Sequence, residues 1–302
     1  MEEALNMSES YSKDVVDYIA SEMVVDHSYI EKDFYATQIL KKLADFTSLD
    51  HRIIFSGGTS LSKGYGLIKR FSEDLDFEID ASGTISQGQR KTIRHDFLDA
   101  ISEIPEIEII NTYAENGGRK QTLSLKYPHL YPIPDNLRDH LKVELFFEPM
   151  EITTEERTIN SFISTYTEQN LENVKILCNH PFNIMADKFN ALTWRIYDSD
   201  DTFDYTTMRH LHDLYAIHQK YNDPERFKKR VLDNFEKKDS QRVHDKNFID
   251  LLKETNKKLL TETIYKKGYE KFVDSMSYAP DNERISYDMA LKDYQDLSKL
   301  FY

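Results

Sequence analysis

Two aspartates alternate with apolar residues in the sequence FSEDLDFEID, a pattern typical of a strand with one polar face. Asp74 and Asp76 are two residues apart, so on a strand their side chains project from the same side with Cβ atoms about 6–7 Å apart. Two such carboxylates repel by roughly 2–3 kcal/mol at an effective dielectric near 20. A hard divalent cation such as Mg²⁺ turns that repulsion into attraction. The alternative is a solvated acidic strand face.

A glycine-containing turn comes before the acidic strand. His51–Phe55, HRIIF, predicts a short strand that leads into this turn, and a helix over 61–68 follows, with Thr59 or Ser60 able to cap it. Glycine lets the backbone approach a ligand closely, and free N–H groups at the start of a helix favour a phosphate. An ordinary strand-to-helix turn is the alternative. The candidate phosphate contacts are Ser56, Gly57, Gly58, Thr59, Ser60 and Lys63.

A third carboxylate is found in a later strand pattern, LKVELFF. Lys142 and Glu144 share one face there, and apolar residues occupy the other. On a strand next to the aspartates, Glu144 could ligate a metal and help deprotonate an attacking hydroxyl. An exposed strand glutamate is the alternative. A phosphate cradle joined to two carboxylates by one helix is more specific than either part, and it predicts a phosphoryl-transfer site.

The surrounding patterns predict the elements that position these residues. Helical spacing over 11–46 is followed by a mixed α/β region, and helical patterns dominate after Pro181. We therefore expect an α+β fold with a core domain over 1–180, N-terminal helices included, and an α-helical C-terminal domain over 181–302. Further predicted elements are a helix over 89–101 and strands around 106–110, 121–127 and 141–147.

The composition excludes several classes of protein. The 302 residues are 39% hydrophobic, which is a globular composition. Cys178 is the single cysteine, so an internal disulfide and a CxxC site are excluded. The acidic N-terminal segment does not resemble a signal peptide, and no apolar stretch approaches the ~20 residues of a membrane span. We therefore expect a cytoplasmic protein without membrane association.

The net charge of −14 argues against nucleic-acid binding, because polyanions are held by Lys and Arg. The charge is uneven, however. Residues 1–180 contain 18 basic and 31 acidic side chains, whereas residues 226–271 contain 14 basic and 8 acidic ones. This second segment could form a local positive surface, and the alternative is a set of solvated lysine-rich helices.

The run FSGGTSLSKGYGLIKRFSEDLDFEI resembles the signature of the AbiEii/AbiGii toxin family of nucleotidyltransferases, within the polymerase-β-like superfamily. The resemblance continues through LKVELFF and ADKFNALTWR and ends at RHLHDLYAI, so it spans Ile53 to Ile217. It implies a mixed sheet flanked by helices and the transfer of a nucleoside monophosphate from an NTP to an acceptor hydroxyl. It also implies Mg²⁺ or Mn²⁺ as the cofactor.

The resemblance further implies a role for individual residues. Asp74 and Asp76 would bind metal ions, Glu144 would be the third acidic residue, Lys188 would contact the nucleotide, and Asp213 is the acid of the last motif. In the turn, Gly57 and Gly58 would shape the backbone while Ser56 or Thr59 faces the triphosphate. Ser72 matches a position used for phosphate contact or regulatory phosphorylation in some related toxins.

Two positions depart from the family pattern. Asp187 stands where many members have Glu, and His210 stands where many have an acid, which leaves the division of roles between His210 and Asp213 open. On a helix, Arg209 and Asp213 could also form a simple ion pair.

The biology implied is that of a toxin from a type IV toxin–antitoxin or phage-defence pair, with a separate DNA-binding antitoxin as partner. Some relatives act on the 3′ end of tRNA, and the basic segment over 226–271 could dock such an RNA. Two other functions stay open. One is nucleotidyl transfer to a small molecule or a protein side chain, and the other is a non-catalytic nucleotide- or partner-binding module.

Overall fold

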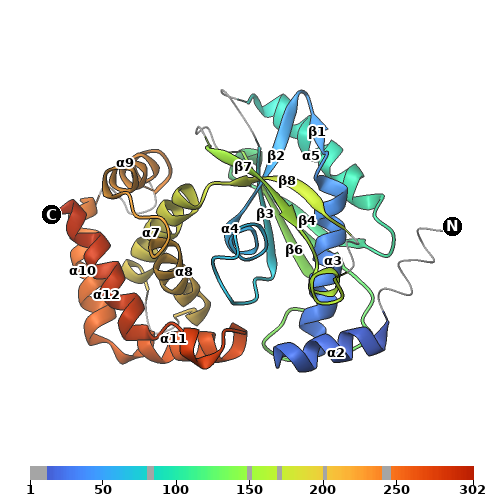
Figure 1. The fold of residues 1–302 in the computed structure, drawn as a ribbon. Helices are drawn as coiled ribbons and strands as arrows, with labels where there is room; N and C mark the ends of the chain where they lie inside the picture. Colours follow the sequence, from blue (N-terminus) through green and yellow to red (C-terminus); the bar gives the residue numbers. More distant parts are fainter. Residues whose placement is uncertain (1–11, 80–84, 148–151, 169–171, 200–202, 240–245) are drawn as a thin grey trace. The chain divides into compact units, whose positions relative to one another are not determined.

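A computed structural model of the chain describes residues 12–79, 85–147, 152–168, 172–199, 203–239 and 246–302 (Figure 1). The chain divides into two compact units. The first comprises Met1–Gly66 and Phe71–Asn179, and the second comprises Leu67–Arg70 and His180–Tyr302. Within the described ranges, the strands lie in the first unit and the long helices of the second follow one another from residue 181.

The first unit begins with two helices, α2 (Lys13–Met23) and α3 (His27–Leu43), as the N-terminal pattern predicts. Ser12 caps α2 by accepting a hydrogen bond from the backbone N–H of Val15. Asp26 caps α3 by accepting one from the backbone N–H of Ser28. These caps satisfy N–H groups that have no partner within the helix, so both helix starts are fixed by local sequence.

The sheet of the first unit is mixed. Its strands run in the order β4-β5-β6-β3-β2-β8-β7, and β1 pairs with β2. The pairs β3–β6 and β2–β8 are parallel and the others are antiparallel. The strands are β1 (Thr47–Ser48), β2 (His51–Ser56), β3 (Asp74–Ile79), β4 (Glu108–Glu115), β5 (Lys120–Lys126), β6 (Leu141–Phe146), β7 (Thr154–Ile159) and β8 (Val174–Asn179).

One face of this sheet packs against helices. Leu75 and Phe77 of β3 are buried there, and the ring centroid of Phe77 lies 6.0 Å from that of Phe97 on helix α5 (Gln87–Ser102). Ser86 and Gln89 form a reciprocal capping box at the start of α5. The apolar half of the β3 alternation therefore forms part of the core, as predicted, and the acidic half lies on the other face.

The segment between β2 and β3 differs from the prediction. The helix begins at once after β2, as α4 (Gly57–Thr59), and continues as a π-helical turn, η1 (Ser60–Gly64). The predicted helix over 61–68 is present only as far as Gly64, and no Thr59 or Ser60 side chain caps it, because Gly57 at φ +72° turns the chain directly out of the strand. β3 starts at Asp74 rather than Phe71, and the predicted strand end at Asp80 lies outside the described residues.

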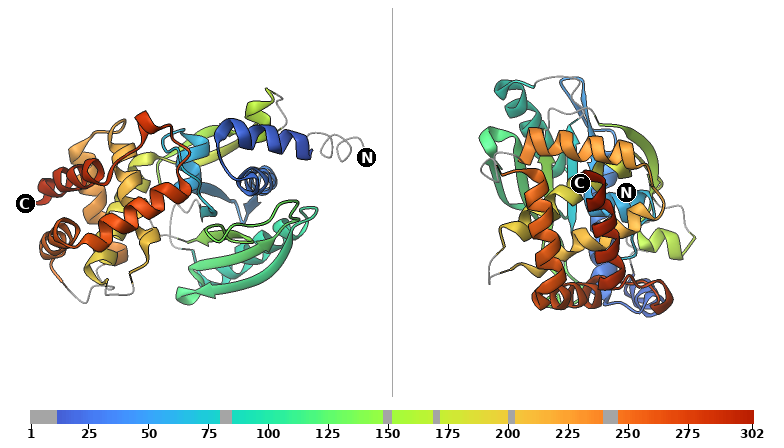
Figure 2. Two further views of the ribbon diagram at one scale, coloured as in Figure 1. Left: turned by 90° about the horizontal axis from the view of Figure 1, so that it is seen from below. Right: turned by 90° about the vertical axis from the view of Figure 1, so that its left-hand side faces the viewer.

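The second unit is helical, as the pattern after Pro181 predicts. Helix α7 packs against α8, α9 and α10, and α12 packs against α8 (Figure 2). Phe189 of α7 lies against Phe227, Tyr294 and Phe301 in an aromatic cluster. The helices are α7 (Pro181–Tyr197), α8 (Met208–His218), α9 (Pro224–Asn234), α10 (Phe248–Thr261), α11 (Thr263–Met276) and α12 (Tyr287–Ser298).

The short segment Leu67–Arg70 belongs to this helical unit. The Lys69 carbonyl accepts a hydrogen bond from the backbone N–H of Tyr278, and Arg70 forms a β-bridge with Ser277. In the part of the chain that the structure describes, no helix is long and apolar enough to cross a membrane.

Candidate active site

A row of side chains crosses the polar face of the sheet. Ser56 on β2 pairs in register with Asp76 on β3, Asp76 with Glu144 on β6, and Glu144 with Thr122 on β5. Residues paired in register project from the same face, and neighbouring strands lie about 4.8 Å apart. Asp74 is two residues before Asp76 on this face. The prediction that Glu144 lies on a strand next to the aspartates is confirmed.

Gly57 allows the Asp76 carboxylate to approach the backbone of the turn. A Cβ atom at residue 57 would lie 1.9 Å from Oδ2 of Asp76, and the φ of +72° is one that side chains rarely adopt. Any other residue here would have to displace the carboxylate or strain the backbone. The glycine therefore has a function that the sequence alone does not reveal, which is to make room for an acidic side chain.

Two hydroxyl groups of the turn form hydrogen bonds within the protein. Thr59 Oγ1 donates to the Asp74 carbonyl at 2.5 Å, and Ser56 Oγ accepts from Asn179 Nδ2 at 3.2 Å. Ser60 is completely buried. These bonds hold β2, the turn and β3 together, while contact of the hydroxyls with a nucleotide stays a prediction.

Two further predicted residues, Lys63 and Ser72, follow this turn in the chain. The Lys63 ammonium is 2.6 Å from Asp33 Oδ1, and its side chain is only 8% exposed. It also lies over the Phe162 ring, 5.2 Å from the centroid. Ser72 is half-buried just before β3. A phosphate contact by Lys63 stays a prediction, and the ion pair with Asp33 favours a structural role.

Asp74 is paired with a cation that the sequence analysis did not identify. Arg138 Nη2 lies 2.6 Å from Asp74 Oδ1, and Arg138 Nε lies 3.3 Å from Glu73. Lys32 approaches the same Glu73 oxygen to 2.7 Å. Arg138 is in the loop before β6, where no local pattern points to a partner on β3. Arg138 therefore holds Asp74 within a charged network that includes Glu73 and Lys32.

Glu144 is held by two lysines. Lys142 Nζ is 2.6 Å and Lys120 Nζ is 2.9 Å from its Oε1 atom. Burial alone would raise the pKa of the Glu144 carboxyl, but Lys142 and Lys120 hold the pKa below its usual range. The carboxylate is therefore ionised at neutral pH. Lys142 could have been found from the alternation on its own strand, whereas Lys120 depends on the β5–β6 register.

The donor atoms on this face suit a magnesium ion shared with the substrate. Among the described residues, no group of three or more His, Cys, Asp or Glu side chains could hold a metal ion by itself. Asp74 and Asp76 nevertheless offer two carboxylates on one face. Mg²⁺ is commonly bound through one or two carboxylates, with water and substrate phosphates completing the shell. The residues present therefore fit Mg²⁺ that binds together with an NTP.

In the helical unit, the predicted residues Lys188 and Asp213 are in direct contact. Asp213 is completely buried, and Arg70 binds it through Nε at 2.7 Å and Nη2 at 2.6 Å. Lys188 Nζ lies 2.7 Å from the carboxylate. Burial alone would raise the pKa of Asp213, yet Arg70 and Lys188 hold the pKa well below its usual value. Arg70 was missed from the sequence, although it lies within the signature run.

His210 is a neutral hydrogen-bond partner. Its Nε2 atom lies 2.9 Å from Arg195 Nη1. Burial, together with the charges of Lys188 and Arg195, places the pKa of His210 well below its usual value. The ring is therefore uncharged, and Nε2 accepts a hydrogen bond from Arg195. Asp213 is the ionised acid of this helix, and its catalytic role stays a prediction.

A mixed sheet that presents two aspartates after a glycine turn places the chain in the class of nucleotidyl-transfer enzymes. The family of AbiEii nucleotidyl transferase toxins of type IV toxin–antitoxin systems matches residues 38–296. The chain belongs to this family and is a nucleotidyltransferase.

The fold is similar to that of MenT4, a nucleotidyltransferase toxin from Mycobacterium tuberculosis H37Rv. The two chains share 13% sequence identity and a TM-score of 0.50, and the match covers 95% of this chain and 88% of MenT4. The predicted α+β nucleotidyltransferase fold is thus confirmed. No curated protein matches the sequence.

Proposed function

We propose that this toxin is a Mg²⁺-dependent enzyme that transfers a nucleoside monophosphate from an NTP to a hydroxyl of an RNA, with the 3′ end of tRNA as the acceptor. The observation that carries the proposal is the pair Asp74 and Asp76 on one strand face, with Gly57 leaving space for the second carboxylate. A separate DNA-binding antitoxin completes the proposed system.

The reaction forms one bond and breaks another. The acceptor oxygen attacks the α-phosphorus of the NTP in line, the bond to the β-phosphate oxygen breaks, and pyrophosphate leaves. Mg²⁺ bound by Asp74 and Asp76 would neutralise the phosphate charge and polarise the acceptor oxygen. Glu144 lies next to Asp76 in the row of side chains on the sheet. From there it would orient the acceptor hydroxyl or accept the proton of that hydroxyl. Positioning and electrostatics supply most of the rate.

Lys188 is the proposed contact for the triphosphate in the helical unit. Its ammonium is buried against Asp213 and has three N–H donors, so one can be directed to a phosphate while another stays on the carboxylate. Arg70 holds Asp213 from a second direction. In this arrangement Asp213 acts as the anchor that fixes the position of Lys188.

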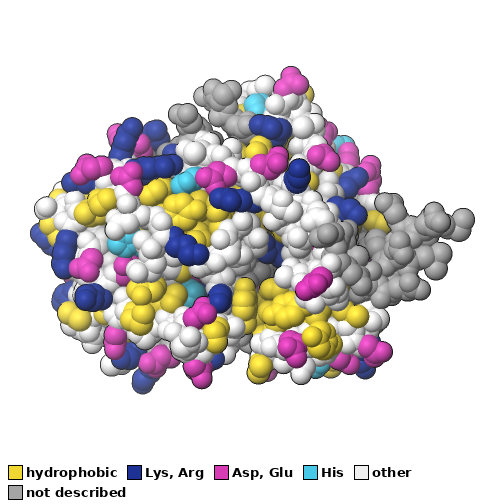
Figure 3. Space-filling model, in the orientation of Figure 1, with side chains coloured by type: hydrophobic (Ala, Val, Ile, Leu, Met, Phe, Trp, Pro, Cys, Tyr) yellow, Lys and Arg dark blue, Asp and Glu magenta, His cyan; other side chains and the backbone are white. Residues whose placement is uncertain are grey.

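The RNA acceptor is supported by the basic segment 226–271, of which 240–245 lie outside the described residues. Arg226 and Lys229 on α9 and Lys253 and Lys257 on α10 are exposed. Figure 3 shows Lys and Arg side chains interspersed with Asp and Glu on the face in view. The attraction is therefore local, and we expect RNA binding to weaken steeply with salt.

The test is incorporation of each labelled NTP into total tRNA by the full chain with Mg²⁺. We expect labelled RNA and pyrophosphate from the native protein, and a loss of at least about 100-fold in Asp76→Asn, because a metal ligand is removed. Glu156→Gln makes the same chemical change on the exposed edge strand β7 and should leave the rate unchanged. Chelation of the metal should stop the reaction, and added Mg²⁺ should restore it.

Each outcome of this assay decides a part of the proposal. Label found only on protein or on a small molecule would show that RNA is not the acceptor and would favour a protein side chain or a small molecule in that role. Full activity in the presence of a chelator would show that the reaction does not require a metal ion. Neither incorporation nor pyrophosphate with any NTP would overturn the proposed reaction.

A further inference from the structure

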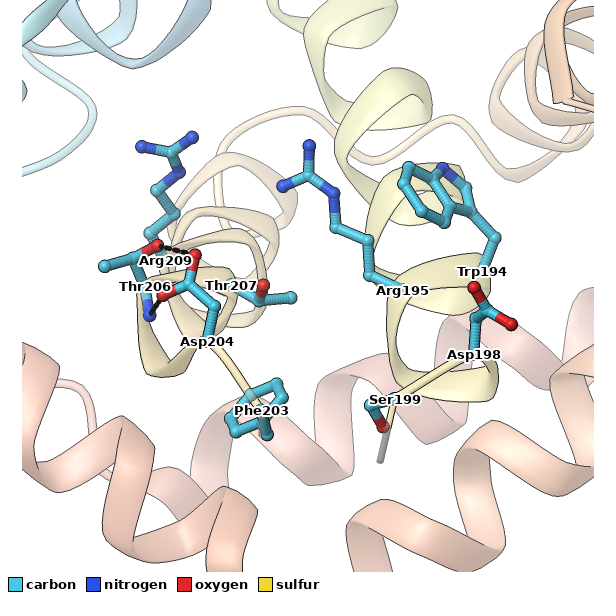
Figure 4. Close-up of a pocket in the computed structure, with 9 residues that line it drawn as sticks. All are labelled: Trp194, Arg195, Asp198, Ser199, Phe203, Asp204, Thr206, Thr207 and Arg209. Atoms are coloured by element: carbon cyan, nitrogen blue, oxygen red, sulfur yellow. Dashed lines mark hydrogen bonds between the residues drawn. The ribbon is translucent and has the colours of Figure 1, made fainter. Parts of the chain in front are cut away.

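A pocket lies within the helical unit, between the end of α7 and the start of α8 (Figure 4). Its volume of about 420 Å³ is in the range of small-molecule sites. Trp194, Arg195 and Asp198 line it from α7 and the residue that follows, and Thr206 and Arg209 line it from the other side. None of the residues proposed for catalysis lines this pocket.

Two guanidinium groups extend towards the same side of the pocket. Figure 4 shows Arg195 and Arg209 reaching in this direction from two different helices. A guanidinium binds phosphate through two parallel N–H groups, so two of them form a suitable phosphate clamp. Arg195 is oriented by His210, whose neutral ring accepts its hydrogen bond.

The pocket also contains the single tryptophan of the chain. Trp194 is half-buried, and the guanidinium carbon of Arg195 lies 5.2 Å from its ring centroid. An indole ring offers a flat surface on which a base can stack. Aromatic rings beside arginines are the usual platform on which proteins stack the bases of single-stranded nucleic acids.

Two carboxylates also line the pocket: Asp198 follows α7, and Asp204 accepts hydrogen bonds from the backbone N–H and the hydroxyl of Thr206. Asp198 lies next to Trp194 in Figure 4. A purely anionic ligand would be repelled at that end of the pocket. A nucleotide has an anionic phosphate and a base whose N–H groups can donate to a carboxylate, so it suits a pocket that contains both arginines and carboxylates.

We propose that this pocket binds one nucleotide unit, with the phosphate between Arg195 and Arg209 and the base stacked on Trp194. The unit is either a free nucleotide or one residue of the acceptor RNA. The inference rests on the proposed function only for the choice of nucleotides as the ligand class.

Trp194 provides a direct test, since the intrinsic tryptophan fluorescence of the protein comes from this pocket alone. We would titrate the full-length Asp76→Asn protein, which cannot turn over, with AMP, GMP, CMP and UMP and with a single-stranded decaribonucleotide. We expect saturable quenching, with an affinity about tenfold weaker in Arg195→Met and Arg209→Met. Arg284→Met removes an exposed arginine of the same unit and should not change the affinity.

The oligonucleotide also carries a dye, so that its anisotropy reports binding without the tryptophan. Trp194→Phe keeps a stacking ring and should retain the affinity, whereas Trp194→Ala should lose about tenfold. Circular dichroism verifies that each variant is folded, and Arg195→Lys, which keeps the charge but not the planar fork, should show an intermediate affinity.

The titrations also identify the source of the nucleotide. Quenching by the oligonucleotide alone assigns the pocket to the RNA chain, and equal quenching by mononucleotides assigns it to a free nucleotide. Absence of saturable quenching by either, or equal affinities in native and Arg195→Met proteins, would overturn the proposal. If quenching occurs but no NTP is incorporated into RNA, the proposed nucleotide pocket is supported and the proposed reaction is rejected.

Discussion

The contact between Gly57 and Asp76 shows how one backbone position controls a reactive side chain. Oδ2 of Asp76 occupies the space where a Cβ of residue 57 would be. The sequence pattern alone favours a phosphate contact at this glycine, because glycine lets the backbone approach a ligand closely. In the structure, the missing side chain of Gly57 leaves space for the Asp76 carboxylate. The position of this carboxylate therefore depends on the glycine turn as well as on its own strand.

This contact predicts the effect of Gly57→Ala. The added methyl group must push the Asp76 carboxylate away, so we expect pyrophosphate release to fall by about 100-fold while the protein remains folded. Gly66→Ala is the matched control, because Gly66 also has a positive φ, of +60°, but a Cβ there meets nothing within 4 Å. It should cost about 1 kcal/mol of stability and leave activity intact. Equal loss of activity in both variants would contradict the assigned role.

At the scale of elements, the site depends on strand register. Asp76 and Glu144 become neighbours only because β3 and β6 pair in parallel with these two residues opposite one another. A further link is Asn179 at the end of β8, whose Nδ2 donates to Ser56 Oγ on β2 and, at 2.8 Å, to Glu78 Oε1 on β3. This buried amide ties three strands together at the edge of the site.

Asn179→Asp keeps the shape of the side chain and changes its charge. The variant loses a donor to Glu78 and places a second carboxylate next to it, so we expect the free energy of unfolding to fall by about 2–4 kcal/mol. Urea denaturation at neutral pH measures the change. Asn111→Asp, on exposed β4, is the control and should shift stability by less than about 0.5 kcal/mol. If the two variants are equally stable, Asn179 is not the link described.

Local periodicity predicted the elements that have a polar and an apolar face. The N-terminal helices, the central strands and the helical C-terminal region all show such a period, as do the aspartates of β3. β7 and β8 were not predicted: TEERTI is a largely polar edge strand without apolar alternation, and VKILCN is a six-residue strand directly before the helical region. Arg138 and Lys120 were missed for a different reason, since their partners are chosen by tertiary pairing, which no local pattern encodes.

At the scale of the whole molecule, the chain does not divide at a single point. Leu67–Arg70 belongs to the helical unit although it precedes β3 in sequence. The domain boundary at residues 180/181 stays a prediction, because a domain in the full sense folds by itself, and residues 181–302 alone lack the Arg70 that pairs with Asp213.

The charges of the helical unit predict how stability depends on pH. Burial lowers the pKa of His210 and of His212, and Lys188 and Arg195 add to the effect at His210 while Asp213 opposes it. Both pKa values are therefore lower in the folded protein than in the unfolded chain, which protonates these rings near pH 6.5. Their contribution to stability is therefore complete above that pH and is lost as pH falls below it.

Chemical denaturation at pH 8, 6 and 5 measures this loss. We expect His210→Gln to flatten the dependence, because one of the two rings is removed and glutamine can still accept from Arg195. His95→Gln changes an exposed histidine of the first unit and should leave the dependence as it is. If the stability of His210→Gln depends on pH as that of the wild type does, the His210 ring does not contribute to the pH dependence.

The pairing of Arg70 with Asp213 also determines how late in translation this part of the protein can form. The two residues are 143 positions apart, so at 5–20 residues per second the ribosome needs roughly 7 to 30 seconds to add the carboxylate after the guanidinium. Until then Arg70 has no Asp213 to bind, and Lys188 has no anchor. A nascent chain therefore acquires the complete arrangement only late in translation, and a truncated product would not acquire it at all.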